Sequence, residues 1–341
     1  MKRVGNLWEK IVDLENIKLA HKQARRGKLF YTEVKMIDAD VDYYCQQIQQ
    51  MLVNKTFRTS EYEQEMRFDG RKERMIFKLP YFPDRIVQHA LLNVVGPIFV
   101  RSFIRDSFQS IPGRGTHDAM KKVKKLIRSV DCPKYALKID VQKYYPSVNN
   151  ALLKEAVCRK IKCTNTLWLM DDIIDSMQGL PIGNYTSQHF GNLYLNAFDW
   201  WMKQEVKPAG YFRYCDDIVV LGNSVAELQV ICTQMLDKLA DLQLKVKPNW
   251  AIRDIEEQGL DFVGFVFRPK YTRLRRTIAR NFARTCRFVR QHLLEIPRDI
   301  ALSKLMAYKG WIKYASAKKL WRKHIVSSLQ RAFPVQLRGA I

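Results

Sequence analysis

The sequence has no uninterrupted hydrophobic run near the length of about 20 residues that a membrane-spanning helix requires. Its opening residues, Met1 to Val4, are not followed by the hydrophobic core of a secretory signal. These two absences predict a cytoplasmic protein with no membrane partner.

Cysteines of the kind that build disulfide frameworks or zinc sites are also missing. The seven cysteines are odd in number, and none has C-x-x-C spacing. Cys158 and Cys163 are the closest pair, but no neighbouring His or Cys completes a tetrahedral zinc set. We therefore expect reduced thiols that are mostly buried.

Acidic residues are scarce, with 34 Asp and Glu against 58 Lys and Arg, which gives a net charge of +24. From Phe262 to Ile341 there are 19 basic residues and only two acids, Glu295 and Asp299. An excess of this size calls for a polyanionic partner, and nucleic acid is the expected one. The hydrophobic content of 47% is that of an ordinary globular protein with room for more than one domain.

Paired carboxylates stand in the most informative stretch, residues 211–222. Two hydrophobic arms flank Tyr214-Cys215-Asp216-Asp217, which predicts a β-hairpin with acids at its tip. Asp-Asp pairs are also common in plain surface turns. Against that alternative, Lys138-Ile139-Asp140-Val141 is a second strand-like segment that ends in a carboxylate.

Carboxylates on two neighbouring strands would form an oxygen-rich site. Mg²⁺ is usually held by one or two carboxylates together with substrate phosphates. The pattern therefore favours a two-metal centre for phosphoryl transfer.

The Tyr-x-Asp-Asp box at Tyr214 to Asp217, with Asp140 followed by Tyr145, resembles the palm motifs of reverse transcriptases. The resemblance implies an α+β right-hand polymerase with fingers, a palm with an antiparallel sheet, and a helical thumb. It implies that Asp140, Asp216 and Asp217 are catalytic and that they hold two Mg²⁺ ions together with the backbone carbonyl of Val141. It also implies dNTPs, a template RNA and an RNA/cDNA duplex as ligands, with Tyr145 excluding the ribose 2′-hydroxyl.

An Asp-Gly turn between two alternating runs predicts a hairpin over residues 66–78. A solvated hairpin is the plain alternative. In the resembled family such a hairpin in the fingers places basic side chains on the nucleotide triphosphate, and Lys72 and Arg74 occupy the matching positions.

The loop 107–119 is rich in glycine and enters a basic helix, which suits phosphate binding, although many such loops are only turns. By resemblance, Arg114 and His117 contact the template or support the loop itself. Four arginines at helical spacing predict a basic face on the thumb that contacts template and primer: Arg276, Arg280, Arg284 and Arg287.

A second glycine-marked loop, residues 178–188, indicates the subfamily. Most reverse transcriptases carry Gln-Gly and then Ser-Pro, whereas this chain has Ile182-Gly183 and Ser187-Gln188. This combination resembles the reverse transcriptases of diversity-generating retroelements, which are bacterial or phage-encoded, copy RNA with errors at adenines, and use a small, basic, oligomeric accessory protein. We expect Ile182, Gly183 and Gln188 at the nucleotide.

By resemblance the domains are fingers at 1–135 with early palm elements, palm at 136–267 with a fingers insertion around 150–190, and a basic helical thumb at 268–341. The pattern predicts helices over residues 7–28, 40–52, 83–95, 189–201 and 224–242 and a hairpin over 259–267. His89 is expected to be a packed or capping histidine and not a catalytic one, and Lys245 and Lys247 are expected to be exposed basic side chains. No residue is assigned as a general acid.

Two alternatives remain. The chain could be a group II intron or retron-type reverse transcriptase, although no Cys/His-rich module follows the thumb and Ile182 and Gln188 depart from both patterns. It could also be an RNA-binding module with a polymerase fold that has lost catalysis. Retention of all three carboxylates argues against that, because they would repel one another without a cation.

Overall fold

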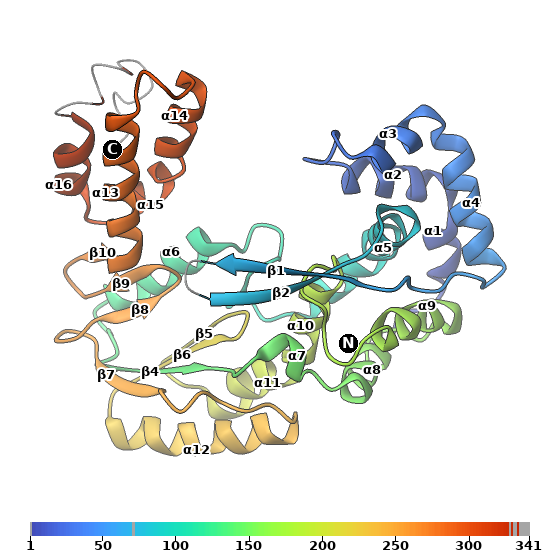
Figure 1. Cartoon of the computed structure of the whole chain (residues 1–341). Helices are drawn as coiled ribbons and strands as arrows, with labels where there is room; N and C mark the ends of the chain where they lie inside the picture. The colour runs from blue at the N-terminus through green and yellow to red at the C-terminus, as the bar shows by residue number, and fades with distance from the viewer. Residues whose placement is uncertain (1, 70–71, 327–328, 330–332, 334–341) are drawn as a thin grey trace. The chain divides into compact units, whose positions relative to one another are not determined.

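The computed structural model describes residues 2–69, 72–326, 329 and 333. The chain divides into two compact units. Figure 1 labels the helices and strands of both. The first unit contains residues 1–111, 140–206 and 233–248, and the second contains residues 112–139, 207–232 and 249–341. The boundaries predicted for fingers, palm and thumb stay a prediction.

The first unit begins with short helices, α1 (Trp8–Val12) and α2 (Leu14–Ala24), where the sequence pattern predicted one helix over residues 7–28. That prediction was wrong at Asp13, whose backbone leaves the helical region at φ −59° and ψ 130°. The Asp13 carboxylate accepts a hydrogen bond of 3.1 Å from the backbone N–H of Asn16, so this residue caps α2. Helical periodicity alone does not reveal such a break.

The core of this unit is α5 (Ile86–Ser102), which is longer than its pattern predicted and is buried over most of its length. Helix α2 packs against it, and Asn16 donates a 3.0 Å hydrogen bond to the carbonyl of Ala90. The expected helix over residues 40–52 is α4 (Val41–Val53), which begins with Asp40 as its cap. Helix α3 (Thr32–Ala39) lies between α2 and α4 in the chain, and the short π-helical turn η1 (Tyr81–Arg85) directly precedes α5.

The predicted hairpin is present as β1 (Glu63–Asp69) and β2 (Lys72–Lys78), paired antiparallel, with its tip at 70–71 outside the described residues.

The rest of the unit is mainly helical. The expected helix over residues 189–201 is interrupted at Leu195, which has φ −87° and ψ 2°. The remaining elements are β3 (Ser107–Phe108), α7 (Tyr144–Ser147), α8 (Asn150–Cys158), α9 (Thr164–Asp175), α10 (Ser187–Tyr194), α11 (Asn196–Trp201) and η2 (Met202–Val206).

The second unit contains strands β5 (Gly210–Tyr214), β6 (Asp217–Gly222), β4 (Tyr135–Asp140) and β7 (Ala251–Asp254), which lie in that order in the sheet. The pairs β5·β6 and β4·β7 are antiparallel. Helix α6 (Thr116–Ile127) precedes β4, and α12 (Val225–Asp241) begins in this unit and ends in the first. The hydrophobic strands β5 and β6 are almost wholly buried, as their sequence predicted.

The C-terminal part of this unit combines a small sheet with helices. The expected hairpin over residues 259–267 is β8 (Leu260–Phe262) with β9 (Phe265–Phe267), and β10 (Thr272–Leu274) completes the sheet. Helix α13 (Arg276–Gln291) buries Phe282, Cys286 and Val289 as the pattern predicted. Its Phe282 ring stacks on Trp321 at 5.9 Å. The other helical segments are α14 (Arg298–Met306), α15 (Lys309–Tyr314), α16 (Lys318–Trp321) and η3 (Arg322–Val326).

All seven cysteines are free thiols, and four of them are buried: Cys45, Cys215, Cys232 and Cys286. This confirms the expectation from their spacing. Within the described residues, no helix has the length and hydrophobicity needed to cross a membrane.

Candidate active site

The acidic pair lies at the turn of the β5–β6 hairpin, as predicted. The strand register pairs Tyr214 with Asp217, so Cys215 and Asp216 form the turn itself. Cys215 has a φ of 57°, in the left-handed region that a two-residue hairpin turn demands. The hairpin thus presents two successive carboxylates at one end of the sheet.

A buried arginine, whose role was not predicted from the sequence, supports this turn. Arg213 has no solvent exposure, and its guanidinium donates a 3.0 Å hydrogen bond to the backbone carbonyl of Cys215. A guanidinium is costly to bury unless it is fully paired. The sequence did contain one indication of this role, since Arg213 is a charged residue inside a strand that is otherwise hydrophobic.

Asp140 is the last residue of β4, the strand next to β6 in the sheet. The segment at Val246 holds it by an antiparallel bridge to Val141, in which Lys247 N–H donates to the Asp140 carbonyl at 2.9 Å. The Lys247 ammonium also forms an ion pair with the Asp140 carboxylate. The prediction that Lys247 is merely an exposed basic side chain was therefore wrong, because chain pairing carries it to this acid.

A lysine also accompanies Asp217. The Lys138 ammonium lies 3.1 Å from the Asp217 carboxylate and donates to the carbonyl of Asp261 at 2.8 Å. Two of the three predicted catalytic carboxylates therefore stand beside cationic groups.

The donor set predicted for a metal consists of oxygen atoms only, from Asp140, Asp216, Asp217 and the carbonyl of Val141. Hard divalent cations such as Mg²⁺ prefer such donors, and the carboxylates of Asp140 and Asp217 each lie beside a lysine ammonium. The donor chemistry therefore fits the ion. Asp140 belongs to the first unit and the hairpin acids to the second, and among the described residues no cluster of three or more acidic, His or Cys side chains that could hold a metal occurs. The metal assignment stays a prediction.

Several residues predicted to bind the nucleotide meet in the first unit. The backbone N–H of Phe77, in β2, donates to the carbonyl of Ile182 at 2.8 Å. Gly183 follows with a φ of 135°, and a side chain there would lie 2.2 Å from the Phe77 carbonyl oxygen. Only glycine fits at this position. Strand β2 also carries Arg74, whereas the side chain of Lys72 lies outside the described residues.

Tyr145 contacts the start of the loop 178–188 through its backbone. Its carbonyl accepts a 2.8 Å hydrogen bond from the N–H of Leu180. A side chain at Gly179 would lie 2.6 Å from the carbonyl oxygen of Pro146, so the backbones touch. The structure thus gathers Tyr145, the loop 178–188 and strand β2.

The second half of the loop is held from both sides. Ser187 donates to the carbonyl of Pro181 at 2.7 Å, and the Gln188 side chain accepts a hydrogen bond from the Ser110 hydroxyl. Gln88 accepts from the N–H of Tyr185 at 2.9 Å. Gln188 is therefore fixed by the neighbouring glycine-rich segment.

The Tyr185 ring stacks on His89 at 3.8 Å with an interplanar angle of 10°. His89 is only 8% exposed, and its burial lowers the pKa to about 4. The ring is therefore neutral at physiological pH. This confirms that His89 is a packed residue.

The first turn of α6 contacts two other parts of the second unit. The hydroxyls of Thr116 and Tyr214 are 3.1 Å apart, and the ring of His117 contacts that of Tyr314 at 4.5 Å. Burial, and then the nearby charge of Lys121, lower the pKa of His117. These contacts favour a structural role for His117, while template contact by Arg114 and His117 stays a prediction.

The four predicted arginines of α13 are exposed: Arg276, Arg280, Arg284 and Arg287. They lie opposite the buried Phe282 and Cys286, so the helix is amphipathic as expected. Their contact with template and primer stays a prediction.

The acidic hairpin and strands β4 to β7 lie within a stretch that matches a known protein family. Residues 68–266, more than half of the chain, match the family model described as reverse transcriptase (RNA-dependent DNA polymerase). The chain belongs to this family.

A relative from Escherichia coli (strain K12), Protein YkfC, is 26% identical over 218 residues, which cover 49% of this chain and 57% of the relative. The match thus spans little more than half of that relative.

Among solved structures, apo telomerase from Candida tropicalis superposes with a TM-score of 0.51 at 12% identity, over 82% of this chain and 61% of the telomerase chain. Telomerase from Candida albicans with a fragment of telomeric RNA gives a TM-score of 0.48 at 10% identity, over 86% and 59%. The Candida tropicalis likeness concerns the fold alone. It confirms the prediction of an α+β right-hand polymerase fold.

Proposed function

We propose that this protein is an RNA-directed DNA polymerase that extends a primer with dNTPs on a template RNA. The observation that carries the proposal is the β5–β6 turn, which presents Asp216 and Asp217 beside the strand that ends in Asp140. Family membership supports the same activity. The reaction joins the primer 3′-hydroxyl to the α-phosphate of the nucleotide and releases pyrophosphate.

Asp140, Asp216, Asp217 and the Val141 carbonyl would hold two Mg²⁺ ions. When bound, such ions make the primer hydroxyl a better nucleophile and neutralise charge on the triphosphate. The chain itself fixes the carboxylates through the hairpin register and the bridge from Val141 to Val246. Arg74 and Lys72 on β2 would bind the triphosphate, and the Tyr145 side chain would exclude a ribose 2′-hydroxyl.

Within the family, we propose the reverse transcriptase of a diversity-generating retroelement, which makes cDNA with errors at template adenines. The supporting feature is Ile182, whose hydrophobic side chain stands where most relatives carry an amide. An amide can restrain a nucleotide by hydrogen bonds, whereas isoleucine offers shape alone. A small, basic, oligomeric accessory protein is then a partner, and the site of action is the bacterial cytoplasm.

The test is primer extension on an RNA template with Mg²⁺ and all four dNTPs, followed by sequencing of the products. The double variant Asp216→Ala/Asp217→Ala should lose extension, while Asp237→Asn on the exposed face of α12 should keep it. Extension by the double variant would refute the polymerase assignment. Loss of extension in every sample, with cognate RNA and accessory protein present, would favour an RNA-binding module.

The subfamily is tested separately with Ile182→Gln. We expect the wild-type protein to misincorporate mainly opposite adenine and the variant to do so less often. Accurate copying by the wild type would instead indicate a group II intron or retron-type enzyme.

A further inference from the structure

The hydroxyl of Tyr62 joins the loop 178–188 to the end of α9. The side-chain amide of Asn184 donates to this hydroxyl at 2.7 Å, and the hydroxyls of Tyr62 and Ser176 are also 2.7 Å apart. Ser176 donates its own proton to the carbonyl of Ile173 at 2.7 Å. Because a serine hydroxyl has only one proton, Tyr62 is the donor to Ser176. The hydrogen bonds therefore form a chain with one direction, from the loop through Tyr62 into the helix end.

This chain is costly to interrupt. Asn184 is only 7% exposed, so an amide that lost its partner there could not turn to water. Burial raises the pKa of Tyr62, so its hydroxyl keeps its proton at neutral pH. Hydrogen bonds that are linked in series also strengthen one another.

Two acids fix the segment that precedes Tyr62. Asp172 of α9 accepts hydrogen bonds of 2.8 Å from both the backbone N–H and the hydroxyl of Thr59. Asp84 of η1, which is fully buried, accepts from the N–H of Ser60 at 3.0 Å and from its hydroxyl at 2.7 Å. Tyr62 therefore extends from a fixed stretch of backbone and can serve as an anchor for the loop.

Tyr62 also contacts the strand that touches the loop. Its ring packs edge to face on Phe77 of β2, with the ring centroids 6.1 Å apart and an interplanar angle of 87°. The backbone N–H of Phe77 donates to the carbonyl of Ile182. Ile182 thus lies between two attachments, at Phe77 and at Asn184, and Tyr62 contacts both.

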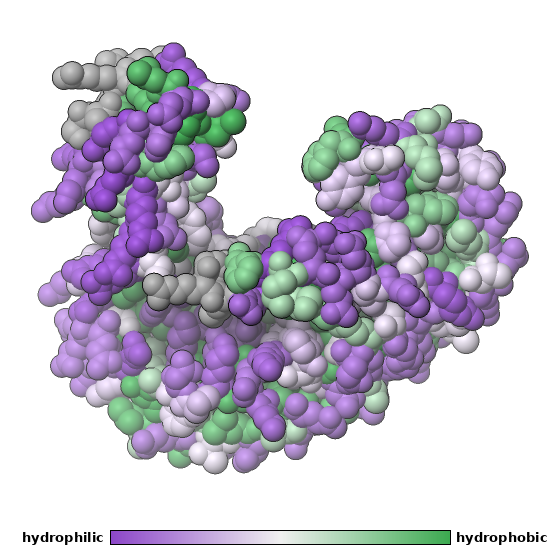
Figure 2. All heavy atoms as spheres, in the orientation of Figure 1, coloured by the Kyte–Doolittle hydropathy of each residue, from purple (hydrophilic) through white to green (hydrophobic). Residues whose placement is uncertain are grey.

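Close packing contributes little to this arrangement. None of the described residues of β1 and β2 is fully buried, and hydrophobic and hydrophilic residues are mixed over this hairpin in Figure 2. An open pocket of about 340 Å³ lies beside Tyr62, and its walls include Phe77, Ser176 and Met177. Because space remains on this side, hydrogen bonds are what fix the loop here.

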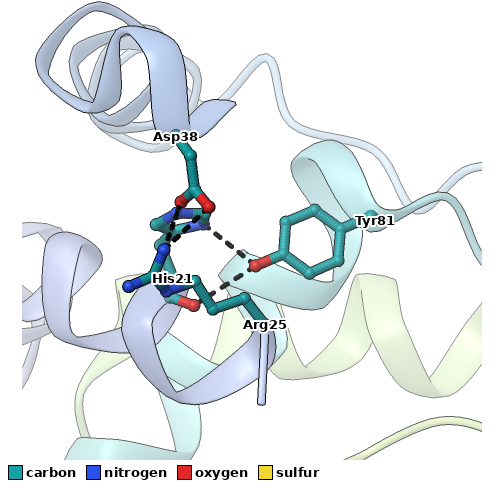
Figure 3. Close-up of polar contacts among 4 residues, drawn as sticks. All are labelled: His21, Arg25, Asp38 and Tyr81. Carbon is teal, nitrogen blue, oxygen red and sulfur yellow. Dashed lines mark hydrogen bonds and ion pairs between the residues drawn. The ribbon is translucent and has the colours of Figure 1, made fainter. Parts of the chain in front are cut away.

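A second tyrosine hydroxyl of the same unit belongs to a different network (Figure 3). Tyr81 is 2% exposed, and its hydroxyl lies 2.9 Å from the His21 ring and donates to the His21 carbonyl at 3.2 Å. The same ring lies 2.8 Å from the carboxylate of Asp38, which accepts 2.7 Å hydrogen bonds from Arg25. Within the described residues, none of these hydrogen bonds reaches the loop 178–188. Tyr81 therefore supports the unit without holding the loop.

We propose that Tyr62 is a positioning residue for nucleotide selection, which holds the loop at Asn184 and thereby places Ile182 against the incoming nucleotide. A small displacement of a group that contacts substrate is enough to change how well the substrate is held. With the chain of hydrogen bonds broken, the loop takes up several positions and selects nucleotides less strictly. The inference rests on the proposed function, because that function places Ile182 at the nucleotide.

The experiment compares Tyr62→Phe, which removes the hydroxyl and keeps the ring, with the wild type in single-nucleotide extension on an RNA template. The KM for the correct dNTP should rise about five- to tenfold while kcat changes less than about twofold. Misincorporation opposite adenine should rise as well. Tyr81→Phe is the matched control, because it removes a buried hydroxyl from the same unit and should leave KM and misincorporation unchanged. Asn184→Ala should raise KM in the same way, and combining it with Tyr62→Phe should add little, since both remove one bond.

Hydrogen exchange of the loop 178–188, measured by mass spectrometry without RNA or dNTPs, tests the anchor independently of activity. Exchange should be faster in Tyr62→Phe and unchanged in Tyr81→Phe. Unchanged exchange in Tyr62→Phe, or an equal increase in both variants, would overturn the inference. An active wild type whose KM and misincorporation are the same in Tyr62→Phe would overturn the inference alone. A wild type that extends no primer would instead refute the proposed function and, with it, the role of Tyr62 in selection.

Discussion

The acidic hairpin at 210–222 and the loop at 178–188 are both marked by short motifs, but they are held in different ways. The hairpin is a local structure, because its two strands pair with each other and its supporting Arg213 lies one residue before Tyr214. The loop has no helix or strand before Ser187, where α10 begins. It takes its shape from Phe77, Gln88, Ser110 and Tyr145, which are far away in the sequence.

This difference teaches where each part is vulnerable. Substitutions should destabilise the hairpin when they change its own residues. The loop should be destabilised by substitutions in distant segments as well.

Arg213→Met should lower the free energy of unfolding by about 3–5 kcal/mol, because groups paired with a buried charge lose their partner. Chemical denaturation measures this, with Arg253→Met on the exposed position of β7 as the control. A loss below about 1 kcal/mol would mean that the hairpin does not depend on this guanidinium.

The lowered pKa of His89, which stacks on Tyr185 of the loop, predicts that the stability of the chain depends on pH. Its pKa is about 4 in the folded chain against an ordinary value of 6.5. Between these values the unfolded chain binds more protons, so stability is fully present above about pH 6.5 and falls as the pH drops toward 4, by up to about 3 kcal/mol.

The measurement is denaturation of the wild type and His89→Phe at pH 7 and pH 4.5. Phenylalanine can still stack on Tyr185 but takes up no proton. The variant should therefore lose less stability on acidification. Identical pH profiles would show that the histidine does not titrate in this way.

Gly183→Ala should destabilise the loop by about 1–3 kcal/mol, since the φ of 135° suits glycine and the new carbon would meet the Phe77 carbonyl. We also expect a raised KM for dNTPs in primer extension. Gly115→Ala is the matched control, because its added carbon meets no atom within 4 Å. If both variants behaved alike, the contact with β2 would not shape the loop.

Lys247→Gln should change stability by less than about 1 kcal/mol, because the ion pair with Asp140 is about one-third exposed and screened by solvent. Lys245→Gln serves as its control in the same denaturation series. A loss of several kcal/mol would mean that Asp140 depends on this lysine as strongly as the hairpin depends on Arg213.

Much of the fold could be predicted from the sequence. The hairpins at 66–78, 211–222 and 259–267, the amphipathic α13 and the packed His89 all follow from local alternation, helical spacing or turn residues. The breaks at Asp13 and Leu195 were missed, because a single residue that leaves the helical region hardly alters the hydrophobic period. The distribution of the chain between two units was not predicted either.

The local elements, the positive charge and the positions of the acids follow directly from the residues, because hydrophobic period and composition act over short distances. The pairing of Lys247 with Asp140, the contact of β2 with Gly183 and the burial of Arg213 beneath the turn arise only when the chain is folded. Each of these contacts joins backbone or charged groups whose partners are selected by strand pairing and packing. The residue types alone do not indicate which groups become partners.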